Sequence, residues 1–437
     1  VGVDDTGSDS STTGEPPCGL EGQVDPACEA LDPARPYCVG AVCTGCEAAG
    51  GDTFCLDRDA LAPACDAAGG DCVGCGLADH PVCVDASPVC GAAGECLACT
   101  AHDECPTGAC HLGSDDPLVG HCFLPEEVIY VDNEATVCPG SGTQDEPMCS
   151  LTAAAAMIEP GDARVLQVSG GTPYVERAQF TGELAVAIVG EGGPVIRGNP
   201  AQQAASFIFE DGAIGYVRNL DLDGNAMTHG LSCSFGSLRI EDVRVRNNDG
   251  WGLFDFDPCV VELDRVVIAG NEDGGIRVSG GELSLVNATV AVNGIGASSS
   301  GVRLLGGVAA DILYSTIAGN NGSGFDSIEC TGATGTLRNS IVVGVNANSI
   351  AIDCFPLMMS YNAVDANNFA GGTNKLVGAY NAAYFSSPAM GDMTLSAPPL
   401  TPYGAVGLWV EGDPLLDIEG TPRPVDGSLG YAGIDEP

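Results

Sequence analysis

The sequence predicts an all-β fold, a parallel β-helix solenoid preceded by a disulfide-rich region with little secondary structure. Two observations predict it. Short β-branched runs recur in the second half of the chain, each closed by an asparagine, and such a repeat is typical of units that stack on one another. Sixteen of the 22 cysteines lie between Cys18 and Cys122. The closing asparagines lie 21–27 residues apart, at Asn225, Asn247, Asn271, Asn293, Asn320, Asn346 and Asn367.

Within the repeat, alternating pairs such as Val243/Val245 and Val266/Ile268 fit strands with one buried face. Asparagine tolerates the left-handed backbone conformation, so we expect a tight corner at each closing asparagine. The runs together predict about ten coils.

The chain carries 59 acidic residues and 15 basic ones, a formal net charge of −44 over 437 residues. Nucleic acid is therefore excluded as a partner, because phosphate binding needs clustered cations. Anionic membranes would be repelled, as would anionic polysaccharides that no metal bridges. No cofactor is indicated, although the acidity would suit calcium.

The N-terminal part divides into an acidic tether over residues 1–17 and a cysteine-rich region over residues 18–122. The region has few large apolar residues, so we expect disulfides to hold it together. Their pairing cannot be deduced from the sequence. Zinc binding or redox chemistry at the Cys-x-x-Cys pairs (43/46, 72/75 and 96/99) is the weaker interpretation, since so many cysteines are typical of an exported chain.

The solenoid is predicted over residues 123–437, beginning with a strand at 128–132. A short helix over 150–158, with Ser150 as its N-cap, would cover the first coil. A C-terminal cap is expected from about residue 395 to 437. Cysteines about one coil apart should lie on adjacent strands, and two more flank the loop before the helix. The predicted disulfides are Cys233–Cys259, Cys330–Cys354 and Cys138–Cys149.

Two segments resemble bacterial surface proteins with a right-handed parallel β-helix. Residues 140–143, 150–153 and 171–176 (GSGT, SLTA, GTPYVE) resemble the opening of the pectate-lyase-like superfamily. Residues 417–424 and 430–436 (DIEGTPRP, GYAGIDE) look like the closing signature of choice-of-anchor Q proteins. The resemblance implies a right-handed solenoid at the bacterial outer surface or outside the cell. The cysteine-rich region resembles lipoprotein modules, so membrane attachment would come through a lipid anchor upstream of Val1.

Enzymes of that superfamily cleave polysaccharides on one outer face, with a Ca²⁺-binding acidic cluster beside an Arg or Lys base, or with paired carboxylates. We therefore aligned the strand that follows each asparagine corner. The alignment gives a patch that could bind a sugar, with Trp251 or Phe254 as a stacking platform. A ladder of cross-strand ion pairs is the favoured interpretation of the same patch. The candidate catalytic or sugar-binding residues are Asp255, Asp257, Arg277, Arg303 and Asp326.

Asp221 and Asp223 are weak calcium candidates, because the segment resembles part of a calcium loop but lacks its remaining ligands. A plain turn is the alternative there. His229, the one histidine of the predicted solenoid, is interpreted as a turn residue rather than a base.

The leading functional hypothesis is a non-enzymatic surface or secreted protein, a rod on a cysteine-rich stalk. Its partner would be a polysaccharide or another surface protein, for adhesion or envelope structure. The rival hypothesis is a polysaccharide lyase or glycoside hydrolase acting on the rod face. A rod that self-assembles through its ends is a third, weaker one, because both ends are expected to be capped.

Overall fold

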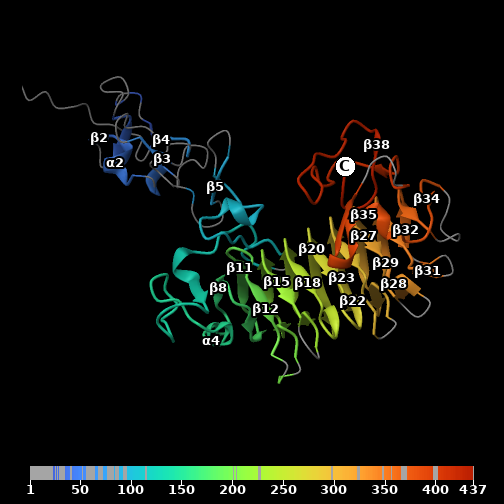
Figure 1. Cartoon of the computed structure of the whole chain (residues 1–437). Coiled ribbons are helices and arrows are strands. Elements are labelled where there is room, and N and C mark those ends of the chain that lie inside the picture. The colour runs from blue at the N-terminus through green and yellow to red at the C-terminus, as the bar shows by residue number, and fades with distance from the viewer. Residues whose placement is uncertain are drawn as a thin grey trace, which may run out of the picture. The chain divides into compact units, whose positions relative to one another are not determined.

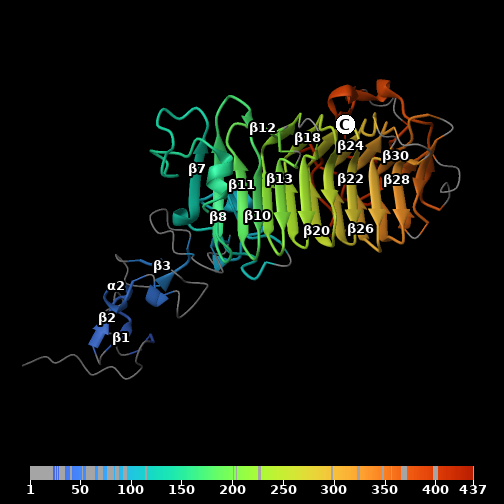
Figure 2. The ribbon, with the colours of Figure 1, turned by 90° about the horizontal axis from the view of Figure 1, so that it is seen from below.

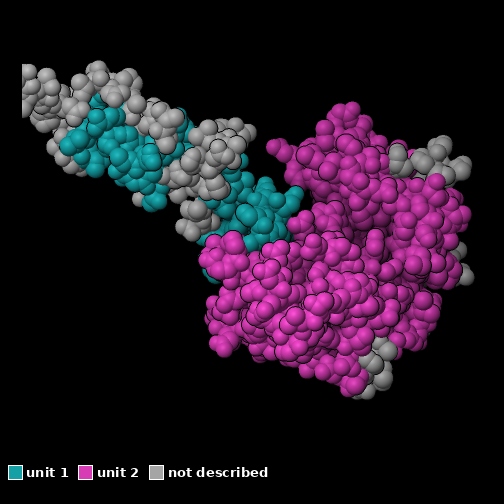
Figure 3. Space-filling model, turned by 60° about the vertical axis from the view of Figure 1, so that its left-hand side comes forward, with its two compact units in different colours: residues 1–112, 117–122 teal, residues 113–116, 123–437 magenta. Residues whose placement is uncertain are grey.

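The structure is a computed structural model of the whole chain (Figure 1), which divides into two compact units (Figure 3). Unit 1 comprises residues 1–112 and 117–122, and unit 2 comprises residues 113–116 and 123–437. No helix among the described residues is both long and apolar enough to span a membrane. The described residues are 23–436, except 25, 27, 29–34, 40–41, 52, 56–63, 67–71, 76–82, 84–87, 92–95, 114–115, 200, 203, 225–227, 297–298, 322–324, 347–348, 356, 366–371 and 397–401. The predicted tether and two of the closing asparagines, Asn225 and Asn367, lie outside them.

Unit 1 is a series of small disulfide-linked modules. In three successive modules the first cysteine pairs with the third and the second pairs with the fourth: Cys46–Cys65 with Cys55–Cys72, Cys75–Cys90 with Cys83–Cys96, and Cys99–Cys110 with Cys105–Cys122. Each Cys-x-x-Cys pair spans a module boundary, because its first cysteine closes one module and its second opens the next.

The secondary structure of unit 1 is sparse, as the composition predicts. Its elements are the hairpin strands β1 (Tyr37–Val39) and β2 (Val42–Thr44), helix α2 (Cys46–Ala49), the pairs β3 (Ala64–Cys65) with β4 (Cys72–Val73) and β5 (Val89–Cys90) with β6 (Cys96–Leu97), and the 3₁₀ turn η1 (His102–Glu104). Such short elements bury little apolar surface, so the crosslinks take the place of a core.

Unit 2 is a parallel β-helix whose strands stack into three long sheets (Figure 2). Sheet 1 has eight strands: β10 (Ala178–Thr181), β13 (Phe207–Glu210), β16 (Leu231–Ser234), β19 (Trp251–Asp255), β22 (Gly274–Ser279), β25 (Val302–Leu305), β28 (Phe325–Thr331) and β31 (Ile350–Asp353).

Sheets 2 and 3 have ten strands each. Sheet 2 contains β7 (Val128–Asp132), β8 (Ala163–Ser169), β11 (Ala185–Gly190), β14 (Ile214–Arg218), β17 (Ser237–Glu241), β20 (Cys259–Asp264), β23 (Gly281–Val286), β26 (Ala309–Leu313), β29 (Thr334–Arg338) and β32 (Leu357–Ser360). Sheet 3 contains β9 (Tyr174–Val175), β12 (Val195–Arg197), β15 (Asp221–Asp223), β18 (Arg244–Arg246), β21 (Val267–Ala269), β24 (Thr289–Ala291), β27 (Thr316–Ala318), β30 (Ile341–Val343), β33 (Ala363–Val364) and β34 (Lys375–Leu376).

The corner between sheets 2 and 3 is a single residue with left-handed backbone. It falls directly after each strand of sheet 2 from β14 onward, rather than at the closing asparagine as expected. Asparagine and aspartate accept this conformation readily, whereas arginine and tyrosine adopt it at a cost. The corner residues are Asn219, Asp242, Arg265, Asn287, Tyr314, Asn339 and Tyr361, with φ between 45° and 57°.

The closing asparagines instead form a buried ladder at the corner between sheets 3 and 1. Four members, Asn248, Asn271, Asn293 and Asn320, are at most 1% exposed. The backbone N–H of each of the first three donates to the side-chain oxygen of the next, at 3.0–3.1 Å. Asn247 is not a member: it adopts the left-handed conformation expected of it, with φ 55°, and Asn248 takes the ladder position.

A column of glycines makes room for this ladder. Gly252 and Gly275 are the second residues of the sheet 1 strands β19 and β22, and a Cβ on either would lie within 3.0 Å of a ladder amide nitrogen. A side chain in this column would therefore displace the ladder, and the next coil also has a glycine here, Gly301, against the amide of Asn320.

The first coil lacks a sheet 1 strand, and helix α4 (Leu151–Ala155) packs there against β10. The helix is shorter than the predicted 150–158, but Ser150 caps it by accepting the Ala153 N–H at 3.2 Å. The 3₁₀ turn η2 (Pro125–Glu127) leads into β7, which has the predicted bounds of the first strand.

The C-terminal segment packs against the side of the solenoid and not over its end, so the predicted end cap is wrong in its placement (Figure 1). Sheet 3 is charged on its outer face at β15 and β18, but small or apolar from β21 onward, and the segment covers that apolar part. Its elements are η3 (Ala382–Tyr384), β35 (Phe385–Ser387), η4 (Pro388–Met390), β36 (Asp392–Leu395), β37 (Gly407–Leu408) and β38 (Leu429–Gly430).

Three consecutive corner residues hold this segment. Asn287 accepts a 2.9 Å bond from Arg423, whose guanidinium lies 3.8 Å from the ring centre of Tyr314. Asn339 exchanges two 2.9 Å bonds with the backbone of Leu408. The arginine of the closing signature therefore fastens the segment to the solenoid.

The structure also contains the three disulfides expected from cysteine spacing. Cys233–Cys259 and Cys330–Cys354 each join neighbouring coils, with Cα atoms 6.3 Å and 4.8 Å apart. Cys138–Cys149 closes the loop before α4.

Replacing Asn271 by alanine should lower the free energy of unfolding by about 2–4 kcal/mol, because it leaves buried backbone groups unpaired. Denaturant unfolding would measure this loss. The control is Asn321→Ala, since Asn321 is exposed beside the ladder, and it should stay within about 0.5 kcal/mol of wild type. Equal losses in both variants would contradict the ladder's role.

Asp413→Asn should release the C-terminal segment, because Asp413 binds both terminal nitrogens of Arg338. Bonds to charged groups contribute about 1.5–3 kcal/mol. We expect faster amide exchange in β37 and β38 but not in the solenoid strands. Glu411→Gln, at an exposed position two residues earlier, should leave exchange unchanged; slow exchange in Asp413→Asn would refute the fastening.

Candidate functional site

The outer face of sheet 1 carries one continuous column of side chains along the solenoid. The register pairs Ser232 with Phe254, Phe254 with Arg277, and Arg277 with Arg303. Three predicted outward residues, Phe254, Arg277 and Arg303, therefore stand side by side.

Beyond Arg303 the predicted column is wrong. Arg303 pairs in register with Glu329, and Glu329 with Asp353. Asp326 precedes Glu329 by three residues, at a bulge where the register of β28 with β31 shifts by one residue between Phe325 and Ile328. Asp326 lies in β28 but outside the column, and its side chain is not among those described.

The middle of the column is an aromatic and cationic stack. The rings of His229 and Phe254 lie parallel, 4.3 Å apart at 9°. The guanidinium carbon of Arg277 lies 4.6 Å from the Phe254 ring centre. Phe256 packs edge-on against Phe254 at 4.2 Å and is itself 61% exposed. Phe254 is thus buried inside the stack, and Phe256 presents an open aromatic face.

His229 serves this stack as a neutral ring. Its Nδ1 accepts the backbone N–H of Trp251 at 2.9 Å, so its proton belongs on Nε2. Burial, and then the charge of Arg277, lower the pKa of His229 to about 4. Trp251 itself is buried and packs over Gly274, so the prediction of Trp251 as a stacking platform is wrong.

Arg277 and Arg303 are two cations on adjacent strands. Arg303 forms an ion pair with Glu329 at 3.3 Å. Arg277 has no ion pair among the described residues, and its Nε is buried without a hydrogen-bond partner. Burial and the neighbouring Arg303 lower the pKa of Arg277. Among the described residues, Arg277 is therefore a guanidinium without a carboxylate partner, in a chain of net charge −44.

The carboxylates predicted beside these arginines lie elsewhere. Asp255 points into the coil and is completely buried, with Oδ2 accepting the Ser279 N–H at 3.3 Å and Oδ1 unpartnered. Burial raises the pKa of Asp255 to about 7. Asp257 lies at the corner and accepts a 3.2 Å bond from Ser234. Successive side chains of a strand point to opposite faces, so the outward position of Phe254 requires Asp255 to point inward.

At the calcium candidates, arginines neutralise the two aspartates. Arg246 lies 3.1 Å from Asp221 and 3.7 Å from Asp223, and Arg244 lies 3.8 Å from Asp221. These pairs form a charged ladder on the outer face of sheet 3.

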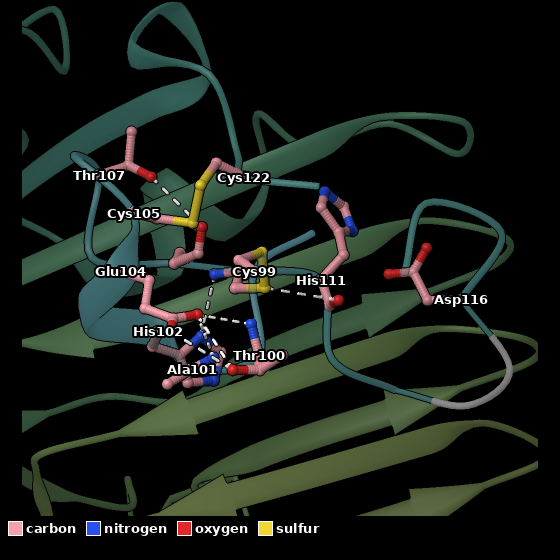
Figure 4. Close-up of a disulfide and its surroundings, with 12 residues drawn as sticks. Cys99, Thr100, Ala101, His102, Glu104, Cys105, Thr107, His111, Asp116 and Cys122 are labelled. Atoms are coloured by element: carbon pink, nitrogen blue, oxygen red, sulfur yellow. Dashed lines mark hydrogen bonds between the residues drawn. A yellow bond between two sulfur atoms is a disulfide. The ribbon is translucent and has the colours of Figure 1, made fainter. Parts of the chain in front are cut away.

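The Cys-x-x-Cys cysteines of unit 1 are all in disulfides, and no described cysteine is free. Among the described residues, every group of three potential metal ligands consists of such cysteines. In the last module, drawn in Figure 4, His102 uses Nδ1 to accept the Cys110 N–H at 3.0 Å. Thiolates for zinc are therefore not offered by these pairs.

The sequence analysis missed Phe256 and the role of His229. Phe256 follows Phe254 by two residues, the spacing of neighbours on one strand face, and this signal could have identified it. His229 lies in the turn before β16, and no local pattern places its ring over a residue 25 positions later.

Asp255→Asn should remove one component of the pH dependence of stability. The carboxyl has an unfolded pKa near 3.8 and a folded pKa of about 7. The folded protein is therefore most stable below about pH 4, where this carboxyl is protonated in both states. Its free energy of unfolding falls as pH rises from about 4 to about 7. The loss is about 1.4 kcal/mol per pH unit at most. Unfolding free energies at pH 4 to 8 should show the variant gaining on wild type as pH rises. Glu282→Gln, at an exposed position, is the control, and a flat difference for Asp255→Asn would refute the buried protonated carboxyl.

Two comparisons with known proteins found matches. A family of unknown function (DUF8331) matches residues 15–128, which include the cysteine-rich region. No curated protein matches. Among solved structures, the crystal structure of pectate lyase Pel9A is similar at 15% identity and a TM-score of 0.41, over 70% of this chain and 96% of that chain. The parallel β-helix itself is established by the three sheets described above.

Proposed function

We propose that the protein is a non-enzymatic, exported surface protein whose β-helix binds a glycan on the outer face of sheet 1. The binding site would comprise Phe256, Phe254, His229, Arg277 and Arg303. The observation that carries the proposal is the stack of His229, Phe254 and Arg277, with the open ring of Phe256 beside it.

The chemistry of the stack suits a sugar. A pyranose ring places its C–H face on an exposed aromatic ring, and Phe256 supplies one. Its hydroxyl or carboxylate groups need charged donors, which Arg277 and Arg303 supply in a planar, bidentate form. Because His229 is neutral near pH 7, its ring extends the aromatic surface of Phe254 without adding charge.

The disulfides support export. Crosslinks at this density form and persist in oxidising compartments. A series of crosslinked modules without a large core suits a spacer between a surface and the solenoid, which is the role we assign to unit 1. The net charge of −44 supports solubility and sets the arginine pair apart from its surroundings.

A polysaccharide lyase is the second candidate. The lowered pKa of Arg277 favours it, because an arginine that acts as a base must give up its proton more readily than usual. The burial of Asp255 favours binding instead, since a carboxylate inside the coil is out of reach of a substrate on the face.

Retention on immobilised neutral and uronic polysaccharides, with and without Ca²⁺, tests the proposal. Phe256→Ala and Arg277→Ala should each weaken binding about tenfold or more, the loss of one stacking or charge-assisted contact. The control is Arg244→Ala, because Arg244 is an exposed arginine on sheet 3, whereas the stack lies on sheet 1.

Retention that all three variants share with wild type would refute the site. New unsaturated or reducing ends, lost in Arg277→Ala, would establish the enzyme in place of the binding protein. A calcium requirement for retention would show that a metal bridges the acidic chain to its ligand.

A further inference from the structure

Phe235 occupies a backbone position that disfavours a bulky side chain. After six of the eight sheet 1 strands, the next residue has left-handed backbone, with φ between 53° and 95°. Glycine adopts this conformation readily, whereas a large side chain adopts it at a cost. An aromatic residue is therefore the exception at this corner between sheets 1 and 2. The six residues are Gly182, Asp211, Phe235, Gly280, Gly306 and Gly332.

Packing does not offset this cost at Phe235. Two other bulky left-handed residues are held by strong contacts. Tyr314 is 2% exposed, with the guanidinium of Arg423 over its ring, and Arg265 forms ion pairs with three carboxylates. The ring of Phe235 is instead 55% exposed. A strained backbone that carries an exposed ring indicates a role for the ring outside the core.

The ring lines a groove at the corner between sheets 1 and 2. Pro258 and Val260 of the next coil line the same groove, as does Glu282 of the coil after that. Phe256 lies at this corner one coil beyond Phe235, and its backbone N–H donates to the oxygen of Cys233 at 3.3 Å. Because neighbouring coils are about 4.8 Å apart, the groove begins close to the open ring of Phe256.

Carboxylates surround this groove. Among the described residues that line it, Glu282 is the only charged one, and it is exposed. Asp211 and Asp257 lie at the same corner, in the coils before and after Phe235. Carboxylates accept hydrogen bonds from hydroxyl groups and repel acidic groups. The groove therefore favours an uncharged, hydroxylated ligand.

We propose that Phe235 is a second stacking platform of the glycan site, and that the ligand is an oligosaccharide that passes around this corner. An uncharged sugar ring stacks on Phe235 and donates hydroxyl groups to Glu282. The inference rests on the proposed function, because it extends the same ligand beyond Phe256. Arg277 lies two coils from Phe235, about 10 Å along the solenoid, which is further than a single sugar ring reaches.

The test is the affinity of wild type and Phe235→Gly for neutral β-glucan and xylan fragments of increasing length. Wild-type affinity should rise with length until a fragment contacts both platforms. Phe235→Gly should weaken binding of the long fragments about fivefold or more, the loss of one stacking contact. Binding of the shortest fragments should not change, because they do not reach Phe235. Phe235→Trp, which keeps an aromatic ring, should retain the affinity of wild type.

The control is Phe355→Gly. Phe355 is 86% exposed at the corresponding corner between β31 and β32, so it matches Phe235 in type and in kind of position. Its replacement should leave the affinity for every fragment unchanged. An equal loss in both variants would show that exposed aromatic rings in general hold the fragments, and the groove would lose its role.

Denaturant unfolding separates ligand binding from support of the fold. Phe235→Gly should unfold at about the denaturant concentration of wild type, because glycine relieves the left-handed strain. A midpoint well below those of wild type and Phe355→Gly would show that the ring stabilises the fold, and would overturn the proposal.

The remaining outcomes distinguish this inference from the proposed function. Unchanged binding of long neutral fragments by Phe235→Gly would refute the second platform, while a loss in Phe256→Ala would still support the site on sheet 1. Retention of oligogalacturonates in place of neutral fragments would refute the uncharged ring alone. A wild-type chain that retains no glycan would remove both proposals.

Discussion

The buried asparagine ladder is the interaction on which the solenoid depends. A β-helix coil must turn sharply three times, and each turn interrupts the backbone hydrogen bonds of its sheets. Buried N–H and C=O groups need partners. Asn271 supplies them, binding the backbone oxygen of Val245, the amide of Asn248 and the side chain of Asn293. The glycine column and the left-handed residue before each asparagine follow from the space and direction that this ladder requires.

A similar ladder repeats at the corner between sheets 2 and 3, from Ser315 through Ser340 to Asn362, with each side chain accepting the N–H of the residue one coil earlier. Polar side chains thus pass through the core at two corners while the rest of the interior stays apolar. Once the corners are fixed, strand alternation assigns every side chain to the inside or the outside. The outer faces of sheets 1 and 3 then differ. Sheet 1 presents the stack of His229, Phe254 and Arg277, and sheet 3 is partly charged and partly covered by the C-terminal segment.

The outer column of sheet 1 shows how far alignment of repeats can carry a site prediction. Phe254, Arg277 and Arg303 were predicted correctly as neighbours, because the coils that hold them connect at the ladder with few inserted residues. The prediction failed at Asp326, where β28 contains a bulge. It also failed at Asp255, because distance along the sequence places a residue near a site without deciding which face it takes. The pairing in unit 1 could not be predicted, since a Cys-x-x-Cys spacing is equally compatible with one module and with a boundary between two.

The sequence by itself determined the repeat, the strand faces and the spacing that brings cysteines one coil apart, because those are local periodicities. Only the tertiary structure decided where the C-terminal segment lies. Its apolar residues had to cover some surface, and the small outward side chains of sheet 3 from β21 onward gave them one. The stack of His229, Phe254 and Arg277 was likewise decided by register, since residues 22–25 positions apart meet only when coils stack.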